Sequence, residues 1–512
     1  MCGIVCLFGE ERVVPPNMLT HRGPDAFASK TLGRCRMDFY RLSINDLSPT
    51  GMQPFTSSDG CTMYVCNGEI YNHRDLVCDK PKGTSDCECL GPRIKKVGIQ
   101  HTLEEVRGDF ALVYTDGKHV IAARDPVGVR PLFYTRYGSG SIAFASEVKA
   151  LLFLNTPVHV FPPGMFYDSY LDEFITYHSG YWPVRTLVRT PNKLKEVLED
   201  AVRVRLANTQ RDVGFLLSGG LDSSLITSIA QRMTKSRIQT FSIGLKGSPD
   251  LDAAKKVATY LGSEHHEVTF TVEEGLRVLP EVVASLETYD TTTIRASVPM
   301  WLLCKYIKEK TTCRYIFSGE GSDELLGGYL YFKNAPGVQE FAMENMRRLK
   351  LIHQFDGLRA DRCAGAHGLD LVVPFLDIKF IHECMKMNQT LKMDPSCEKK
   401  VLRQAFVGYL PEEILWRQKD GMSDAVGTGW VDFLRDRGER MISDNAFLVN
   451  KAICAQHNEP LTKEEVWYRE IFWKFYGCRH DHLISEIWRP RWTDVTDPSA
   501  RLLMDVKKNV PP

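Results

Sequence analysis

One segment constrains the fold of this 512-residue chain more than any other: an apolar run at 215–217 leads directly into the serine- and glycine-rich turn SGGLDSS (218–224). The turn opens an apolar-periodic helix pattern that reaches residue 233. The elements predicted next are a strand at 238–245, a helix at 250–263 and a strand at 266–272. Strands that alternate with helices predict an α/β fold with a doubly wound parallel sheet.

The turn at 218–224 has the composition of an anion-binding loop. Backbone amides and hydroxyls at the start of a helix hold phosphate groups. The segment lacks the G-x-x-x-x-G-K-[ST] pattern, which excludes a Walker P-loop. Instead it resembles the pyrophosphate loop of enzymes that split ATP into AMP and pyrophosphate, and Asp222 is well placed for the Mg²⁺ that such a site requires. The simpler alternative is a helix cap in a serine- and glycine-rich loop.

A second loop, SGEGSDE (318–324), follows the predicted strand at 315–317. Three carboxylates among glycines are costly unless they meet cations. Asp323 is therefore a candidate second magnesium ligand, and Glu320 is a candidate acid that positions the substrate. Further along, Lys419 is a candidate for neutralising the departing pyrophosphate. Taken alone, the loop is an ordinary solvated acidic loop and the lysine an ordinary surface charge.

The chain begins Met1-Cys2-Gly3. Removal of Met1 leaves the Cys2 thiol beside a free α-amine, so that one residue supplies both a nucleophile and a general base. Residues 1 to about 175 read as short strands separated by turns, which predicts stacked β-sheets. The stretch 177–193 contains glycine and two prolines without a clear period, which predicts a linker.

Seven motifs in this first part stand in the order typical of the glutaminase domain of N-terminal-nucleophile amidotransferases, which the region resembles. They are HRGPDAF (21–27), RLSIND (41–46), GMQPF (51–55), CNGEIYNHRDL (66–76), SDCE (85–88), GDFALVYTD (108–116) and RDPVGVRPLFY (124–134).

The chemistry of these residues suits the hydrolysis of glutamine. Asn67 and Gly68 are expected to form an oxyanion hole from one side-chain amide and one backbone N–H. Arg41 is expected to bind the α-carboxylate of glutamine, and Glu69 and Asp86 its α-ammonium. The resemblance adds Leu42, Ser43, Ile44 and Asn45 to the glutamine-binding residues. Considered singly, Asn-Gly is more typical of a hairpin turn and Arg41 of a surface salt bridge.

Over its whole length the chain resembles the glutamine-hydrolysing asparagine synthetases of animal type. The further matches are GSPDL (247–251), GSEHHEV (262–268), LETYDTTTIRAS (286–297), VPFLD (373–377) and DPSARLL (497–503). The resemblance implies a glutaminase domain over 1–180, with the αββα sandwich of the N-terminal nucleophile hydrolases, and an ATP pyrophosphatase domain with extra helices over 192–512. It also implies synthesis of asparagine from aspartate through β-aspartyl-AMP, with ammonia taken from glutamine and with AMP, pyrophosphate and glutamate as further products.

The same resemblance assigns residues to the second site. The nucleotide is expected at Leu216, Ser218, Gly219, Gly220, Leu221, Asp222, Ser223, Ser224, Ile243, Ser318 and Gly319. The aspartyl-adenylate is expected at Thr292, Arg295, Glu320 and Asp377. Mg²⁺ is the implied cofactor, aspartate, glutamine and ATP are the implied substrates, and a homodimer is left open as the assembly.

Three features depart from the family pattern. Val372 stands where the family usually has an arginine, and Asp370 replaces a longer glutamate, so a buried ion pair is expected to be missing. The stretch from Cys87 to Arg107 is shorter than usual, so a helix near Asp86 is expected to be trimmed.

Three alternatives remain open. A related adenylating ligase such as a β-lactam synthetase typically lacks the nucleophilic cysteine, and a phosphoribosyl or sugar-phosphate amidotransferase lacks SGGLDSS. A catalytically idle relative is favoured by Val372 but opposed by the presence of the proposed catalytic residues.

Composition excludes several other classes. The chain has 64 basic and 64 acidic residues, and this zero formal net charge attracts neither nucleic acid nor an anionic membrane. No run approaches the roughly 20 consecutive apolar residues of a spanning helix. Fifteen cysteines, an odd number without a C-x-x-C pair, argue against a disulfide framework and a metal cluster. Reduced thiols and a cytosolic location are therefore expected.

Overall fold

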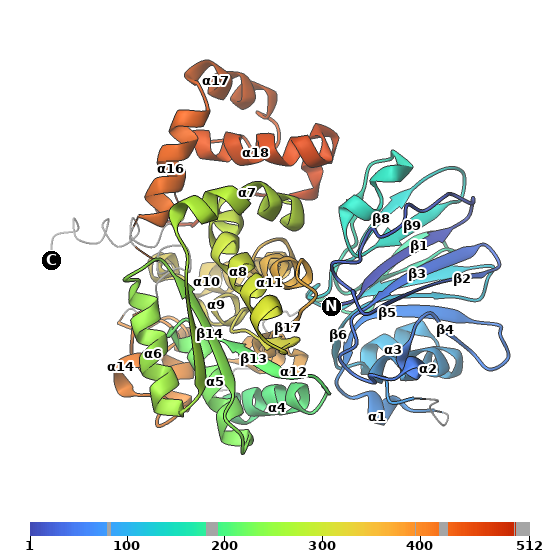
Figure 1. Cartoon of the computed structure of the whole chain (residues 1–512), viewed down its shortest axis with the longest axis horizontal. Helices are drawn as coiled ribbons and strands as arrows, with labels where there is room; N and C mark the ends of the chain where they lie inside the picture. The colour runs from blue at the N-terminus through green and yellow to red at the C-terminus, as the bar shows by residue number, and fades with distance from the viewer. Residues whose placement is uncertain are drawn as a thin grey trace.

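The computed structural model describes residues 1–78, 83–180, 193–394, 396–418, 427, 429–495 and 497. Figure 1 shows two stacked sheets formed by the first part of the chain (residues 1–180), beside a helical body around a third sheet formed by the second part (from residue 193). The N-terminus lies where the two parts meet.

The first sheet is antiparallel, with strand order β10-β8-β9-β1-β3-β2. Its strands are β1 (Gly3–Phe8), β2 (Ala26–Leu32), β3 (Cys35–Arg41), β8 (Phe133–Arg136), β9 (Ile142–Ala145) and β10 (His159–Val160). The second sheet is also antiparallel, with order β12-β11-β7-β6-β5-β4. Its strands are β4 (Phe55–Thr56), β5 (Met63–Ile70), β6 (Gly108–Thr115), β7 (Val120–Arg124), β11 (Met165–Asp168) and β12 (Glu173–Thr176).

The alternation of side chains along β1 explains how the layers stack. Ile4, Cys6 and Phe8 pack into the core between the two sheets, while Val5 and Leu7 join the core that continues into the second part. The outer face of the second sheet packs against a short helical layer. That layer contains α1 (His73–Leu76), α2 (Leu90–Val97) and α3 (Ile99–Glu105), so two helices occupy the shortened stretch after Asp86. The predicted sandwich of stacked sheets is confirmed.

The third sheet is parallel, with order β15-β14-β13-β16-β17. Its strands are β13 (Val213–Leu216), β14 (Gln239–Gly244), β15 (Glu264–Thr269), β16 (Tyr315–Phe317) and β17 (Asp370–Val372). After β13, the chain adds β14 and β15 on one side of it. The chain then crosses to the other side of β13 and adds β16 and β17, so the strand order reverses between β13 and β16. Ligands bind at such a point in doubly wound sheets.

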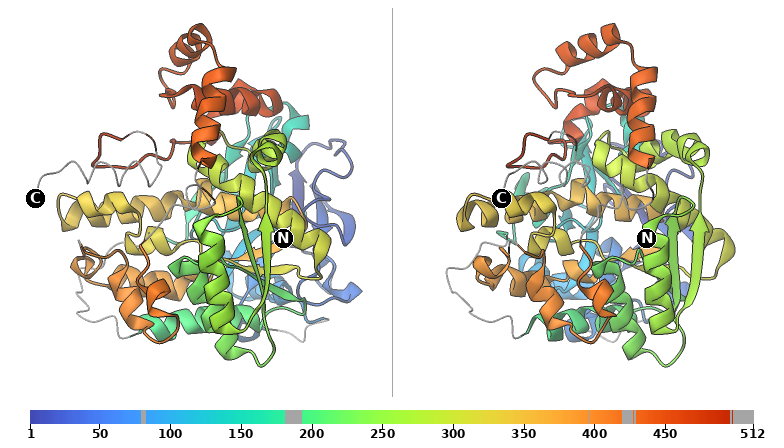
Figure 2. Two further views of the ribbon diagram at one scale, coloured as in Figure 1. Left: turned by 60° about the vertical axis from the view of Figure 1, so that its left-hand side comes forward. Right: turned by 90° about the vertical axis from the view of Figure 1, so that its left-hand side faces the viewer.

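Helices surround this sheet on both faces and extend beyond it. They are α4 (Leu194–Leu206), α5 (Leu221–Met233), α6 (Pro249–Leu261), α7 (Val272–Leu286), α8 (Thr291–Lys310), α9 (Ser322–Leu326), α10 (Val338–Leu351), α11 (Asp356–Gly365), α12 (Ile378–Lys386), α13 (Lys400–Ala405), α14 (Glu412–Leu415), α16 (Trp430–Met441), α17 (Asp444–Ile453) and α18 (Lys463–Tyr476). Figure 2 shows that α16, α17 and α18 form a lobe away from the third sheet. No helix in the described ranges is long and apolar enough to cross a membrane.

Buried ion pairs join the two parts of the chain. Arg22 of the first part bonds Asp361 of α11 through both terminal nitrogens, at 2.7 and 2.9 Å. Arg130 lies 2.8 Å from Asp370, the acid that begins β17. Val372 cannot form the ion pair expected of an arginine at its position, but Asp370 is nevertheless paired, because Arg130 of the first part supplies a cation.

Candidate functional sites

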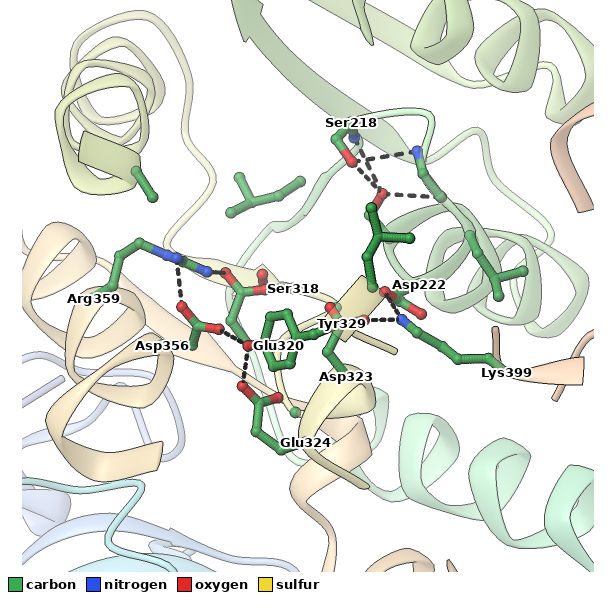
Figure 3. A pocket seen from close by; sticks show the side chains of 18 of the residues that line it. Ser218, Asp222, Ser318, Glu320, Asp323, Glu324, Tyr329, Asp356, Arg359 and Lys399 are labelled. Carbon is green, nitrogen blue, oxygen red and sulfur yellow. Dashed lines mark hydrogen bonds and ion pairs between the residues drawn. The ribbon is translucent and has the colours of Figure 1, made fainter. Parts of the chain in front are cut away.

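A cavity of about 190 Å³ opens where β13 and β16 diverge, and Figure 3 shows it from close by. It lies at the reversal of strand order, and both predicted loops reach it. The sequence-predicted residues that line it are Leu216, Ser218, Gly220, Leu221, Asp222, Ser223, Thr292, Ser318, Gly319, Glu320 and Asp323.

The turn after β13 is held in shape by its own hydroxyls. Ser218 Oγ lies 3.0 Å from Ser223 Oγ and accepts a hydrogen bond from the amide of Gly220 at 3.3 Å. Gly219 has a φ of +73°, and a Cβ there would lie 2.5 Å from Ala253 of α6. A Cβ on Gly319 would lie 2.7 Å from the Ser223 amide nitrogen, so the two loops approach each other too closely for any side chain at that position.

Two aspartates from different loops converge on one buried cation in this cavity. Lys399 Nζ lies 2.6 Å from Asp222 Oδ2 and 2.5 Å from Asp323 Oδ1, as Figure 3 shows. A Cβ on Gly328 would lie 2.1 Å from Lys399 Cε, so this glycine leaves room for the lysine. The arrangement brings the two predicted magnesium ligands to one point, with the ammonium between them.

The opposite wall of the cavity carries a chain of charged groups. Arg359 bonds Glu320 at 3.1 Å and Asp356 at 2.6 Å, and the Tyr329 hydroxyl contacts both Asp356 and Glu324. Burial, and then the charge of Asp356, raise the pKa of Glu324 well above its ordinary range. Arg359 therefore orients Glu320, the predicted substrate-positioning acid, at the cavity wall.

The remaining residues predicted for this site do not line the cavity. Gly219, Ser224 and Ile243 are not among the residues that line the cavity, and Lys419 lies outside the described residues. Arg295 turns away from the cavity, because its guanidinium is held by Glu464 at 2.7 Å and Asp497 at 3.0 Å.

Asp377 has a different position, at the boundary between the two parts of the chain. It caps α12, and it pairs with Arg205 at 2.7 Å and with Arg107 at 3.0 Å. These contacts give it a role in joining the parts. Whether Asp377 also supports the adenylate remains a prediction.

Sequence reasoning missed several residues that line this cavity. They are Tyr329, Asp356, Arg359, Lys399 and Arg417. Arg417 stands two residues before Lys419 in the same segment, which was a usable signal. Nothing in the local sequence distinguishes Lys399 from the neighbouring Lys400, and only the fold brings it between the two loops.

A second candidate site surrounds Cys2, which precedes β1. Its Sγ accepts a hydrogen bond from the Leu42 amide at 3.4 Å, and burial raises the pKa of the thiol. The Met1 amine donates to the Leu369 carbonyl at 3.0 Å, and Met1 is 2% exposed. The free α-amine of Cys2 therefore requires the removal of Met1.

Asn67 lies in β5 with a side chain that no described residue satisfies. It is 1% exposed, yet neither its amide nitrogen nor its amide oxygen has a hydrogen-bond partner among the described residues. Buried amides almost always have partners, so this one is available to a ligand. The next residue must be glycine, because a Cβ on Gly68 would lie 2.2 Å from the Asp109 carbonyl oxygen of β6.

Arg41 ends β3 and is held by a turn of the chain. Its two terminal nitrogens donate to the carbonyl oxygens of Ser48, at 2.8 Å, and Asp46. Burial lowers the pKa of Arg41. The guanidinium is therefore fixed in place before any ligand arrives, although two of its donors are already used.

Glu69 and Asp86 form a buried carboxylate pair. Asp86 Oδ2 accepts from the Ile70 amide at 2.6 Å, and both carboxyls accept from the Asn208 amide. Burial, and then the charge of Asp86, raise the pKa of Glu69 well above its ordinary range. The two predicted acceptors of the α-ammonium therefore lie together, and a cation bound beside them would favour their charged forms.

A larger cavity, of about 720 Å³, lies beside this pair. Asn45 is the only one of the predicted glutamine residues among its described lining, which also includes Ser85 and Asn208. Around Cys2, Ser43 donates its amide to Asp25 at 2.8 Å, and the Ile44 carbonyl accepts from the Gln210 amide of the second part at 3.0 Å.

The chain matches two protein-family models that together cover almost all of it. The model described as glutamine amidotransferase domain matches residues 1–195, and the one described as asparagine synthase matches 193–347 and 333–496. Glutamine-hydrolysing asparagine synthetases of Gallus gallus and Homo sapiens are each 39% identical over the whole of both chains. A probable enzyme of this kind from Acanthamoeba polyphaga mimivirus is 38% identical over 98% of this chain and all of its own. The chain belongs to the glutamine-hydrolysing asparagine synthetase family.

Proposed function

We propose that the protein makes asparagine from aspartate, with ammonia released from glutamine and energy from cleavage of ATP to AMP and pyrophosphate. The observation that carries this proposal is the full-length match to asparagine synthetases. The first part (1–180) is the glutaminase domain, and 192–512 the domain that adenylates aspartate.

In the glutaminase site, the Cys2 thiolate attacks the side-chain amide of glutamine, and the α-amine exposed by removal of Met1 carries the proton. The unsatisfied Asn67 amide and the Gly68 N–H stabilise the oxyanion that forms. Arg41 holds the α-carboxylate, and Glu69 with Asp86 holds the α-ammonium. Water then releases glutamate from the thioester.

In the second site, the turn at 218–224 binds the phosphates of ATP, and the aspartate carboxylate attacks the α-phosphorus. Ammonia then displaces AMP from the aspartyl-adenylate. Glu320, oriented by Arg359, is placed to hold the substrate or to accept a proton from the attacking nitrogen. Lys399 and Lys419 neutralise the pyrophosphate that leaves.

Mg²⁺ fits the residues present. Asp222 and Asp323 supply carboxylate oxygens that already share one cation, and Mg²⁺ is commonly bound by one or two carboxylates with substrate phosphates. No cluster of three or more metal-ligating side chains occurs in the described part of the chain, so Asp222 and Asp323 would hold the metal together with the substrate phosphates. When bound, the metal neutralises phosphate charge, while Lys399 is free to turn toward the phosphates.

The proposed setting is the reducing cytosol, because all fifteen cysteines are free thiols. Light scattering after size-exclusion chromatography decides between a monomer and a homodimer.

Binding of glutamine is expected to weaken as the pH falls, beginning above the range in which a glutamate ordinarily takes up a proton. Glu69 has a raised pKa, so it takes up a proton early as the pH falls and then offers the α-ammonium no charge. The KM for glutamine should therefore rise toward low pH. In Glu69→Gln the KM should be high at every pH and its pH dependence should flatten. An unchanged slope in that variant contradicts the assignment of Glu69.

Product analysis with aspartate, glutamine and ATP tests the proposal. Asparagine, AMP, pyrophosphate and glutamate should appear in equal amounts. Asparagine without AMP, or ADP as the nucleotide product, would overturn it, and a chain that hydrolyses glutamine but makes no asparagine would be an idle relative or another ligase.

A further inference from the structure

The segment that follows α4 lies against the loop predicted to bind glutamine. Gln210 donates its backbone amide to the Ile44 carbonyl at 3.0 Å, and Arg211 Nε donates to the Ser43 carbonyl at 2.6 Å. The Leu47 amide in turn donates to the Gln210 side chain at 3.4 Å. Since α4 packs against α5 and α12, this segment belongs to the body of the second part, yet it reaches the glutaminase site.

Asn208 is the residue of this segment that reaches the carboxylate pair. Its Nδ2 donates to Glu69 Oε2 at 2.6 Å and to Asp86 Oδ2 at 3.2 Å. It is 3% exposed, and its side-chain oxygen accepts from Asn45 Nδ2 at 3.4 Å. Its backbone amide is anchored to the Arg205 carbonyl at 3.1 Å.

The Asn208 amide reduces the electrostatic cost of placing Glu69 and Asp86 side by side. Two buried carboxyls of like charge repel each other and favour protonation of one of them. A neutral amide that donates to both lowers this cost without adding a charge that would compete with a cation. Only Oε2 of Glu69 and Oδ2 of Asp86 bond to Asn208, so the second oxygen of each carboxyl is not committed to it.

We propose that Asn208 is a positioning residue for glutamine: it holds Glu69 and Asp86 together as one acceptor for the α-ammonium of the substrate. The proposal rests on the glutaminase activity proposed above. It means that the affinity of the first site depends on a residue of the second part, ten positions before the turn that binds ATP.

A pair of substrates separates this role from a general effect on folding. Glutamine carries the α-ammonium, and 4-carbamoylbutanoate is the same amide without it. In Asn208→Ala the KM for glutamine should rise about tenfold with little change in kcat, because a charge-assisted bond that orders the pair is lost. The KM for 4-carbamoylbutanoate should stay within about twofold of that of the unmodified protein.

Gln210→Ala is the matched control, because it removes an exposed contact of the same segment that does not touch the pair. Its KM for both substrates should be unchanged. An equal rise for both substrates in Asn208→Ala would show a structural role and overturn the proposal, as would no rise for either.

Ammonia-dependent synthesis reports whether each variant is folded. If Asn208→Ala loses that activity, the ratio of the two KM values is measured on Asn208→Ser, which keeps a small donor and should show a smaller rise for glutamine alone. A parent protein without glutaminase activity would refute the proposed function instead, which is a different result from an unchanged ratio.

Discussion

Replacing Cys2 with alanine is expected to lower glutamine-dependent asparagine formation by about 10⁴-fold or more. Alanine keeps a small residue after Met1 and removes the thiol proposed as the nucleophile of the glutaminase site. Synthesis with ammonium at alkaline pH should remain near that of the unmodified protein, because the cavity between β13 and β16 contains no atom of Cys2. Both activities are measured on the same purified variant, by asparagine formed per ATP cleaved.

The exposed thiol at Cys61 provides the control for this prediction. Cys61→Ala should leave both activities unchanged, since Cys61 is exposed and its sulfur donates to the Asp59 carbonyl of its own turn. Two results would contradict the assignment. Continued use of glutamine by Cys2→Ala would mean that another group is the nucleophile, and loss of ammonia-dependent synthesis would mean that the two sites cannot be separated in this way.

Asp222→Asn is expected to lower asparagine synthesis by about 10³-fold with either nitrogen source. The substitution removes one of the two carboxylates that share Lys399, and with it one of the two proposed ligands of Mg²⁺. The binding of magnesium–ATP, followed by calorimetry, should weaken together with the rate. Glutamine hydrolysis should be nearly unchanged, because the site around Cys2 uses none of these groups.

Asp252 on α6 offers a matched comparison, since it is exposed and does not line the cavity. Asp252→Asn should synthesise asparagine at the ordinary rate. If Asp222→Asn bound magnesium–ATP as tightly as the unmodified protein, the carboxylate would have no part in holding the metal, and the interpretation of the 218–224 turn as a phosphate site would lose its main support.

Local sequence patterns predicted the elements that carry the second site. The apolar run at 215–217 and the turn after it correspond to the end of β13 and the start of α5, and the strand expected at 315–317 is β16. These segments can be predicted from the sequence because a buried parallel strand is a short apolar run, and because glycine is required where the loops after β13 and β16 meet. The third strand was expected at 266–272 and lies at Glu264–Thr269, a shift typical of boundaries.

Local sequence patterns could not predict the contacts between the two parts of the chain. Asn208, Arg130 and Lys399 act through partners between 76 and 240 residues away, and the residues beside them in the chain do not identify these partners. Resemblance to a family predicted the residues of known motifs but not the partner of Asp370. That partner, Arg130, is identified only when the two parts of the chain are seen in space.

The burial of Met1 has a consequence for how the protein matures. Its amine is bonded to Leu369, which is made more than three hundred residues later and comes from the other part of the chain. An aminopeptidase cannot reach a terminus enclosed in this way. Trimming that exposes the Cys2 amine must therefore occur while the chain is still being made or before its two parts close on each other. The order of these events determines whether a finished molecule has a free amine on its proposed nucleophile.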